Sequence, residues 1–499
     1  MKARHAAVTL LILLLPALAW AQNAIVLENQ LTGNPPSEWD IAGAGDFGIQ
    51  GYASDISVDQ GQTIDFKVKT DATDYRIDIY RLGYYGGDGA RLVATVQPSV
   101  ALPQTQPDCG FEPTAKLLDC GNWEVSASWD VPADAVSGLY LAKLVREDAT
   151  PGASHIAFVV RDDDGGSELL FQTSDTTWQA YNRWGETGAA AGYSLYEGPD
   201  GKADKVSYNR PFGTRQYPTE DWLFNAEYPM IRWLERNGYD VSYFTNIDTD
   251  RYGAEIQEHQ VFLSVGHDEY WSRAMRENVT AARDAGVDLA FFSGNEIYWK
   301  VRWEDSIDGA ATPFRTLVCY KEGNLGENQC FDKCDPVAEV WTGLWRSGCD
   351  WTPPADGCEP ENALSGQISW MGTTGAITVP ASYSHLPFWR NTSVATLTPE
   401  QTATFPGGTL GYEWDFEQYE EFYPAGRIRM SETNRDGQTH HLSLYRAASG
   451  ALVFGAGPVQ WSWGLDTFHD RTGGAEDARM QQATVNLFAD MGAQPGTLQ

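Results

Sequence analysis

The segment Val261-Phe-Leu-Ser-Val265 runs directly into Gly266-His267-Asp268-Glu269-Tyr270-Trp271. An apolar run of strand length therefore ends in a cluster of groups that can ionise or bind a metal. The arrangement recurs where Val287-Asp-Leu-Ala-Phe-Phe-Ser293 is followed by Gly294-Asn295-Glu296. Residues 272–285, between the two, have helical spacing, so the whole segment predicts strand, helix, strand. In open α/β sheets, ligands bind beyond the carboxyl ends of the strands, and we expect the functional site there.

The sequence on either side extends this α/β pattern. Leu169-Leu-Phe-Gln172 and Tyr239-Asp-Val-Ser-Tyr-Phe244 are apolar strand candidates, and residues 220–237 between them have helical spacing. Ala451-Leu-Val-Phe-Gly-Ala-Gly457 predicts a further strand, and residues 475–491 predict a closing helix. Strands that alternate with helices predict a mostly parallel sheet covered on both faces.

The N-terminal part of the chain has a different pattern. Between residues 23 and 161, short segments alternate apolar and polar residues, as in Gln62-Thr-Ile-Asp-Phe-Lys-Val68, and Gly, Asp and Pro turns separate them. This predicts a β-sandwich of Ig-like or jelly-roll type. We expect the sandwich over residues 22–162 and the α/β domain over residues 163–499, with an irregular, loop-rich insertion at about 305–440.

Residues 1–21 have the three parts of a secretory signal peptide. A basic start at Met1-Lys-Ala-Arg-His5 precedes an apolar run, and Ala19-Trp20-Ala21 is a cleavage signal. A retained membrane anchor is the alternative, but the apolar run is short for a bilayer span. We therefore expect export to the periplasm or the extracellular space, with no membrane association after cleavage.

Acidic residues outnumber basic residues along the whole chain. The 499 residues include 68 Asp and Glu against 35 Lys and Arg, which gives a formal net charge of −33. Such a charge repels nucleic acid and anionic membrane surfaces, so neither is an expected partner. Because the acidic residues are spread along the sequence, we interpret most of them as a solubilising surface rather than as a cation-binding surface.

Export permits disulfide bonds, and the 7 cysteines fit three bridges and one free thiol. Cys109 and Cys120 bracket a short loop, whereas Cys319 stands alone in an apolar run. The four others share a loop rich in Gly, Pro and Asp; they are Cys330, Cys334, Cys349 and Cys358. A four-cysteine zinc site is the rival interpretation of this loop, but the irregular spacing and the export signal favour bridges.

Polar side chains follow three of the predicted strands and should meet in one crevice. They are Tyr181, His267, Glu269, Asn295 and Glu296. Phenolate and carboxylate are hard oxygen donors, which suit Fe(III) better than zinc. Structural roles compete with this interpretation, since a Tyr in a Trp-rich segment often packs, and Asp268 or Ser272 could cap the following helix.

Six motifs occur along the chain in a fixed order. They are Thr177-Trp-Gln-Ala-Tyr-Asn182, Val206-Ser-Tyr-Asn-Arg-Pro211, Gly266-His-Asp-Glu-Tyr-Trp-Ser272, Gly294-Asn-Glu296, Arg315-Thr-Leu-Val-Cys-Tyr-Lys-Glu322 and Gly411-Tyr-Glu-Trp-Asp415. Together they resemble the large (β) subunit of N,N-dimethylformamidase and its relatives. The resemblance extends from about Gly138 to the C-terminus. It is more specific for the domain family than for the substrate.

The resemblance implies a β-sandwich joined to a glutamine-amidotransferase-like α/β domain, with one Fe(III) per chain held by two tyrosines and a glutamate. Carried over onto this sequence, the glutamate is Glu269 and one tyrosine is Tyr181. The family's other tyrosine lies in an S-G-x-Y strand of the sandwich, which is Ser137-Gly-Leu-Tyr140 in this chain. The positions linked to substrate binding and proton transfer are His267, Asn295, Lys321 and Glu413.

The activity that the resemblance implies is hydrolysis of the C–N bond of a small linear amide, by a chain that is at least dimeric. The family's amidase is cytoplasmic and works with a small α subunit, whereas this chain carries an export signal and extra cysteines. A small partner subunit and the substrate therefore stay open. Two other functions also stay open: a non-catalytic carbohydrate- or surface-binding protein, and a glycoside hydrolase with Glu269 and Glu296 as its acid–base pair.

Overall fold

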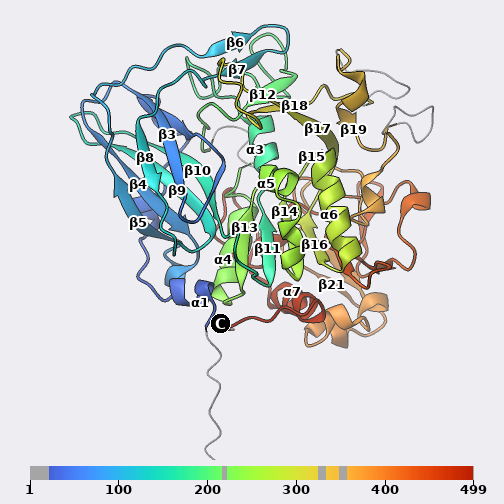
Figure 1. Ribbon diagram of the computed structural model, residues 1–499. Helices are drawn as coiled ribbons and strands as arrows, with labels where there is room; N and C mark the ends of the chain where they lie inside the picture. The colour runs from blue at the N-terminus through green and yellow to red at the C-terminus, as the bar shows by residue number, and fades with distance from the viewer. Residues whose placement is uncertain (1–21, 216–221, 324–332, 348–356, 498–499) are drawn as a thin grey trace, which may run out of the picture.

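The computed structural model describes residues 22–215, 222–323, 333–347 and 357–497. The protein is mixed α/β, with a strand-rich N-terminal part beside a central sheet that is flanked by helices (Figure 1). The predicted signal peptide, residues 1–21, lies outside the described residues. Within the described ranges, no helix combines the length and the apolar character that a bilayer span needs.

Two sheets of the N-terminal part share one core. The smaller sheet contains β1 (Ile49–Ala53), β3 (Thr63–Thr70) and β8 (Ala127–Asp130). The larger contains, in order, β2 (Ser57–Asp59), β10 (Ala153–Arg161), β9 (Gly138–Arg146), β4 (Tyr75–Leu82) and β5 (Ala90–Val96). Phe66 of β3 packs edge-on against Phe158 of β10, with ring centroids 5.8 Å apart. Alternate side chains of β3 are buried, as expected for a strand with one face toward a core.

The central sheet is mostly parallel, as the sequence predicted. Its parallel strands are, in order, β13 (Val241–Phe244), β11 (Leu169–Gln172), β14 (Val261–Gly266), β16 (Asp288–Ser293) and β26 (Leu452–Gly455). Two further strands complete it through antiparallel pairings: β25 (Ser443–Arg446) pairs with β26, and β22 (Ile428–Arg429) pairs with β25. Because β11, β14 and β16 run parallel side by side, their carboxyl ends lie along one edge of the sheet.

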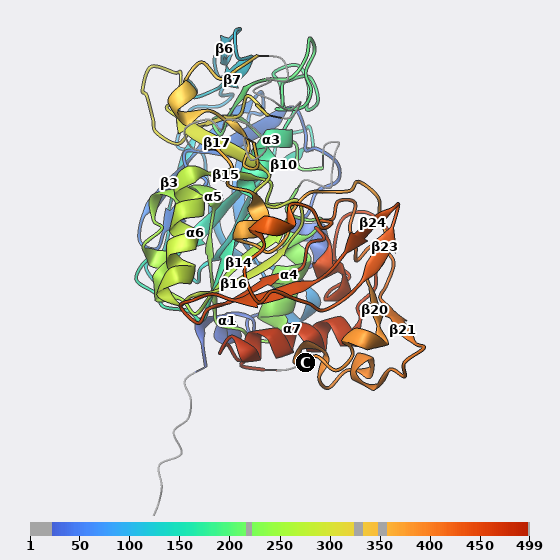
Figure 2. The same cartoon turned by 90° about the vertical axis from the view of Figure 1, so that its right-hand side faces the viewer.

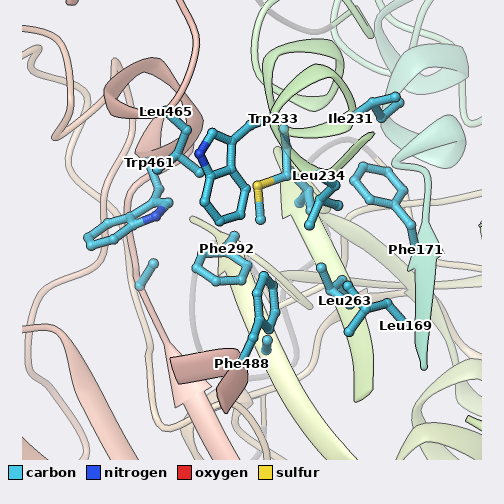
Figure 3. Close-up of a cluster of buried hydrophobic side chains, with 14 of the residues drawn as sticks. Leu169, Phe171, Ile231, Trp233, Leu234, Leu263, Phe292, Trp461, Leu465 and Phe488 are labelled. Atoms are coloured by element: carbon cyan, nitrogen blue, oxygen red, sulfur yellow. The ribbon is translucent and has the colours of Figure 1, made fainter. Parts of the chain in front are cut away.

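Helices cover both faces of this sheet. Helix α6 (Arg273–Ala285) lies on one side of β14 and β16, and α4 (Glu227–Arg236) lies on the other (Figure 2). On the α4 side, Leu169, Leu263 and Phe292 pack with Trp233 and with Phe488 of α7 (Ala478–Asp490) (Figure 3). On the α6 side, neighbouring strand residues such as Leu170 and Phe291 pack with Met275 and Val279. Successive strand residues thus fill two separate cores.

The bounds of two helices show where local sequence decides the structure. Ser272 caps α6, since its Oγ accepts a hydrogen bond from the Met275 backbone N–H at 3.1 Å, and Gly286 follows the helix with φ +112°. The capping alternative at Asp268 is therefore wrong. Helix α4 begins at Glu227 rather than near residue 220. Pro229 lacks an N–H donor and is tolerated only in the first turn, so the helix cannot start much earlier.

A smaller sheet lies next to the carboxyl edge of the central sheet (Figure 1). It contains β12 (Lys205–Ser207), β18 (Thr316–Val318), β17 (Trp299–Glu304) and β15 (Tyr270–Ser272), and β19 (Gly343–Leu344) also pairs with β17. Helix α3 (Asp175–Tyr181) directly follows β11 and contacts β12, β15 and β18. The segment from 305 to 440 otherwise contains only short strands and single-turn helices in its described residues, as expected for a loop-rich insertion.

The described cysteines agree with the predicted bridges. Cys109 and Cys120 form a disulfide, and Cys319 is a buried free thiol whose pKa burial raises to about 11. Cys334 and Cys358 are each disulfide-bonded and are therefore not zinc ligands. Cys330 and Cys349 lie outside the described residues.

Candidate active site

Backbone turns at the ends of β14 and β16 bring the predicted side chains together. Gly266 ends β14 with φ +82°, a left-handed conformation that favours glycine, and the chain then turns toward α3. The Glu269 backbone N–H donates to Thr177 Oγ1 of α3 at 3.1 Å. Gly294 directly follows β16, and any larger side chain there would collide with the Gly457 carbonyl. Asn295 follows with φ +51°, an uncommon conformation for a non-glycine residue that is concentrated at functional sites.

Glu269 lies at the centre of a cluster of oxygen atoms. Its Oε1 accepts hydrogen bonds from the Tyr196 hydroxyl at 2.6 Å and from Trp299 Nε1 at 2.9 Å. Tyr181 stacks on Tyr196 with ring centroids 4.3 Å apart, and their hydroxyls also interact. Glu269 Oε2 is buried without a hydrogen-bond partner. Burial raises the pKa of Glu269, and the nearby charges of His267 and Lys321 oppose this rise.

His267 connects Glu269 to a second carboxylate, Glu413. His267 Nε2 lies 3.1 Å from Glu413 Oε2 and 3.5 Å from Glu269 Oε2. Asn295 Nδ2 donates to Glu413 Oε2 at 2.9 Å, and the Tyr412 hydroxyl lies 3.1 Å from His267 Nδ1. Four of the residues predicted from the sequence, His267, Glu269, Asn295 and Glu413, therefore lie in one continuous set of contacts. The Glu413 side chain is 17% exposed, so water can reach its carboxylate.

Lys321 lies beside the tyrosines rather than beside Glu413. Its Nζ donates to the Tyr270 hydroxyl at 2.7 Å and lies 3.7 Å from the ring centroid of Tyr196 and 4.1 Å from that of Trp299. In this aromatic surrounding, burial lowers the pKa of Lys321 to about 8. The structure brings Lys321 to the same cluster, where its direct partners are the rings next to Glu269.

The structure does not bring Tyr140 to this cluster, which corrects the assignment of a metal ligand to it. The Tyr140 hydroxyl donates to the Val136 carbonyl at 2.7 Å, and its ring packs against Trp129 and Phe158 in the core shared by the two N-terminal sheets. Alternation along β9 explains this orientation. Leu139 and Leu141 face the core that includes α4, so Tyr140 between them faces the opposite way.

Tyr196 belongs to the candidate site, and the sequence interpretation missed it. It lies in the Gly- and Ala-rich loop after α3, in the stretch Gly192-Tyr-Ser-Leu-Tyr196. This loop returns to the strand edge from which α3 departs, which places Tyr196 on Tyr181. The only signal in the sequence is an aromatic residue within a loop that follows a predicted site residue. The Tyr196 side chain is 37% exposed, so the cluster reaches solvent along this ring.

Glu296 does not join Glu269 at the site. Its carboxyl lies next to that of Asp415 instead, and each shifts the pKa of the other. The structure thus gives no support to an acid–base pair of Glu269 and Glu296. Among the residues that the structure describes, no group of three or more His, Cys, Asp and Glu side chains has the geometry of a metal site.

Comparison with protein families identifies the chain. The family described as "N,N-dimethylformamidase beta subunit-like, C-terminal" matches residues 76–476. The protein belongs to this family. The matched range includes Tyr181, Tyr196, Glu269 and Glu413, and a comparison with curated proteins gave no match. Membership of a dimethylformamidase-like family points to an amidohydrolase.

Proposed function

We propose that this protein is an exported, iron-dependent hydrolase that cleaves the C–N bond of small linear amides. The observation that carries the proposal is that the Tyr196 hydroxyl, which also interacts with Tyr181, donates to the buried Glu269, whose Oε2 has no hydrogen-bond partner. A buried carboxylate oxygen without a donor is costly, and a bound cation would offset that cost. Family membership supports the amidohydrolase class.

The donor set fits Fe(III). Tyr181, Tyr196 and Glu269 would hold the ion, since two phenolates and one carboxylate supply three negative charges and hard oxygen ligands. Burial and the Glu269 carboxylate raise the pKa of Tyr196 well above its usual value, so this phenol needs a strong cation to ionise. When bound, Fe(III) would supply Lewis acidity that polarises an amide carbonyl and acidifies water.

The neighbouring residues are placed to move the protons of a hydrolysis. In the reaction, water oxygen forms the new bond to the carbonyl carbon, the C–N bond breaks, and a proton reaches the amine nitrogen. Glu413 accepts the proton of the attacking water and returns it to the leaving amine. His267 Nε2, 3.1 Å from Glu413 Oε2, steadies the negative charge of Glu413. Asn295 Nδ2 orients Glu413 through its hydrogen bond of 2.9 Å.

The finer points of domain structure and assembly are also proposals. We assign the N-terminal sheets to a β-sandwich over residues 22–162 and the central sheet to a glutamine-amidotransferase-like domain over residues 163–499. The family description names a beta subunit, which supports assembly with further chains. A homodimer, with or without a small second subunit, is the arrangement to test by light scattering and native mass spectrometry.

Metal analysis combined with visible spectroscopy tests the proposed iron centre. Purified protein should contain one iron per chain and show a tyrosinate-to-iron charge-transfer band. Tyr196→Phe and Tyr181→Phe should each shift or abolish this band, because each removes a phenolate. Tyr140→Phe is the matched control, since it removes a tyrosine hydroxyl from the same chain away from the cluster, and it should leave the spectrum unchanged. Full amide hydrolysis by iron-free protein would overturn the proposal.

A further inference from the structure

Two buried carboxyl groups, those of Glu296 and Asp415, face each other behind the candidate active site. The two residues are 3% and 1% exposed, and each carboxyl lies close enough to shift the pKa of the other. Both oxygens of Glu296, and Oδ2 of Asp415, are buried without a hydrogen bond from any N–H or hydroxyl of the described residues. The hydroxyl of nearby Ser365 lowers the pKa of Glu296, and it also lies 3.4 Å from the Glu361 carbonyl and 3.1 Å from the Gln367 carbonyl. Two carboxylates cannot hydrogen-bond unless one of them carries a proton.

The pair connects the two segments that supply active-site side chains. Glu296 directly follows Asn295, and Asp415 follows Glu413 by two positions. Asp415 Oδ1 also accepts a hydrogen bond from the Asn295 backbone N–H at 3.1 Å. This bond holds Asn295 in its unusual conformation at φ +51°. Asn295 Nδ2 also donates a hydrogen bond to Glu413 Oε2 at 2.9 Å, so a second contact joins the same two segments.

We infer that Glu296 and Asp415 share a single proton, and that this proton-linked pair positions Asn295 and Glu413 for the hydrolysis proposed above. The inference rests on the proposed function for its catalytic consequence but not for the proton itself. With the proton present, one carboxylic acid donates to the other carboxylate. Without it, two anions lie in contact in a buried space, repel each other, and push the two segments apart.

The surroundings favour retention of the proton. Burial raises the pKa of Glu296 to about 7, and burial together with the charge of Glu296 raises the pKa of Asp415 well above its usual value. The charged and titratable groups near the pair are Glu361, whose charge raises the pKa of both carboxyls, Tyr423, whose pKa the charge of Asp415 raises, and His440, whose Nδ1 lies 3.0 Å from the Asp415 backbone carbonyl oxygen. Glu361 of η5 (Glu361–Ala363) adds a negative charge, although Arg346 Nη2 pairs with it at 2.6 Å.

Amide substitutions distinguish a shared proton from simple packing. Glu296→Gln replaces the shared proton with a permanent amide N–H, so the bond to Asp415 no longer depends on pH. Glu296→Leu keeps a similar volume but supplies no donor. Asp288→Asn is the matched control, because Asp288 begins β16, the strand that ends before Glu296, and burial raises its pKa to about 6. It contacts the Leu452 backbone N–H rather than the site.

The first readout is infrared spectroscopy, which requires no activity. At pH 7, the difference spectrum between the native protein and Glu296→Gln should contain the carbonyl band of a carboxylic acid. Hydrogen exchange at the Asn295 amide is the second readout. The native protein should lose protection as the pH rises above the pKa of the pair, Glu296→Gln should keep it, and Glu296→Leu should lack it at every pH. Absence of the infrared band, or equal exchange in all three proteins, would overturn the inference.

The third readout is the pH profile of kcat with N,N-dimethylformamide as the probe. Native protein and Asp288→Asn should lose activity on the alkaline side, whereas Glu296→Gln should keep kcat within about threefold of its value at pH 6. An unchanged alkaline limb in Glu296→Gln would contradict the positioning role. Protein that shows the infrared band and the exchange pattern but hydrolyses no amide would support the pair and overturn the proposed function alone.

Discussion

The carboxyl ends of β14 and β16 carry similar sequences, Gly-His-Asp-Glu and Gly-Asn-Glu, yet their two glutamates lie in different surroundings. Glu269 accepts a hydrogen bond from the hydroxyl of the partly exposed Tyr196, and its Oε2 has no hydrogen-bond partner, although His267 Nε2 lies 3.5 Å away. Glu296 meets another carboxyl and has no phenol partner. The strand ends therefore place both carboxyls at the same edge of the sheet. The side chains that surround each carboxyl come from other segments, and they decide its chemistry.

The surroundings of Glu269 and Glu296 illustrate two ways in which a buried carboxyl group can be stabilised. Around Glu269 the donors are the Tyr196 hydroxyl and the Trp299 indole N–H, and a metal ion can displace the proton of the hydroxyl. Around Glu296 the partner is an acid, which only a proton can join to it. The first arrangement is suited to binding an ion and the second to holding backbone segments in place. Substitutions of the two glutamates should consequently have unequal effects.

The largest expected effect is that of Glu269→Ala. Loss of the carboxylate removes one of three proposed ligands, so we expect loss of iron and a fall in kcat/KM on the order of 1000-fold. The comparison variant is Glu296→Gln, which should retain iron. Iron content by mass spectrometry and turnover of a small formamide measure the difference. If both variants kept iron, the assignment of Glu269 as a ligand would fail.

Asn295→Ala should have the next largest effect. The substitution removes the side-chain amide that holds Glu413 at 2.9 Å but leaves the backbone bond to Asp415 available. We expect kcat to fall about 100-fold with iron content unchanged, because the proposed proton carrier loses its orientation. A steady-state assay on protein of known iron content checks this. Equal iron loss in Asn295→Ala and Glu269→Ala would show that the two strand ends form one metal site rather than two different ones.

The parts of the fold that were predictable from sequence are those with local signals. The apolar run Val261–Val265 predicted β14, and the helical spacing after it predicted residues 272–285, against Arg273–Ala285 in the structure. Ser272 and Gly286 are capping residues whose effect depends on only a few neighbours. His267, Glu269 and Asn295 were predictable because they directly follow buried strands.

The remaining parts depend on contacts between distant segments. Tyr196 lies in a loop without periodicity, and only the tertiary path of that loop places it on Tyr181. Tyr140 was misassigned because the sequence indicated the strand but not which of its side chains face the α/β part of the protein. Leu139 and Leu141 face the α4 side, so Tyr140 faces the core shared by the two N-terminal sheets. The contact of Glu296 with Asp415 joins segments far apart in the chain, and neither sequence alone indicates a carboxyl partner.

The smallest expected effect concerns stability and again separates Glu296 from Glu269. Burial raises the pKa of Glu296 from 4.5 to about 7, so the folded state binds more protons than the unfolded state between these values. The stability of the native protein should therefore decrease as the pH rises through this window, with the contribution fully present below the lower value and lost above the upper one. Glu296→Gln cannot lose this proton, so its Tm should decrease less between pH 5 and pH 8.

Scanning calorimetry at several pH values measures the difference, with Asp288→Asn as the control for a buried acid away from the pair. A Tm profile of Glu296→Gln parallel to that of the native protein would mean that Glu296 is ionised in the folded state, and the contrast between the two strand ends would then have to rest on the tyrosines alone.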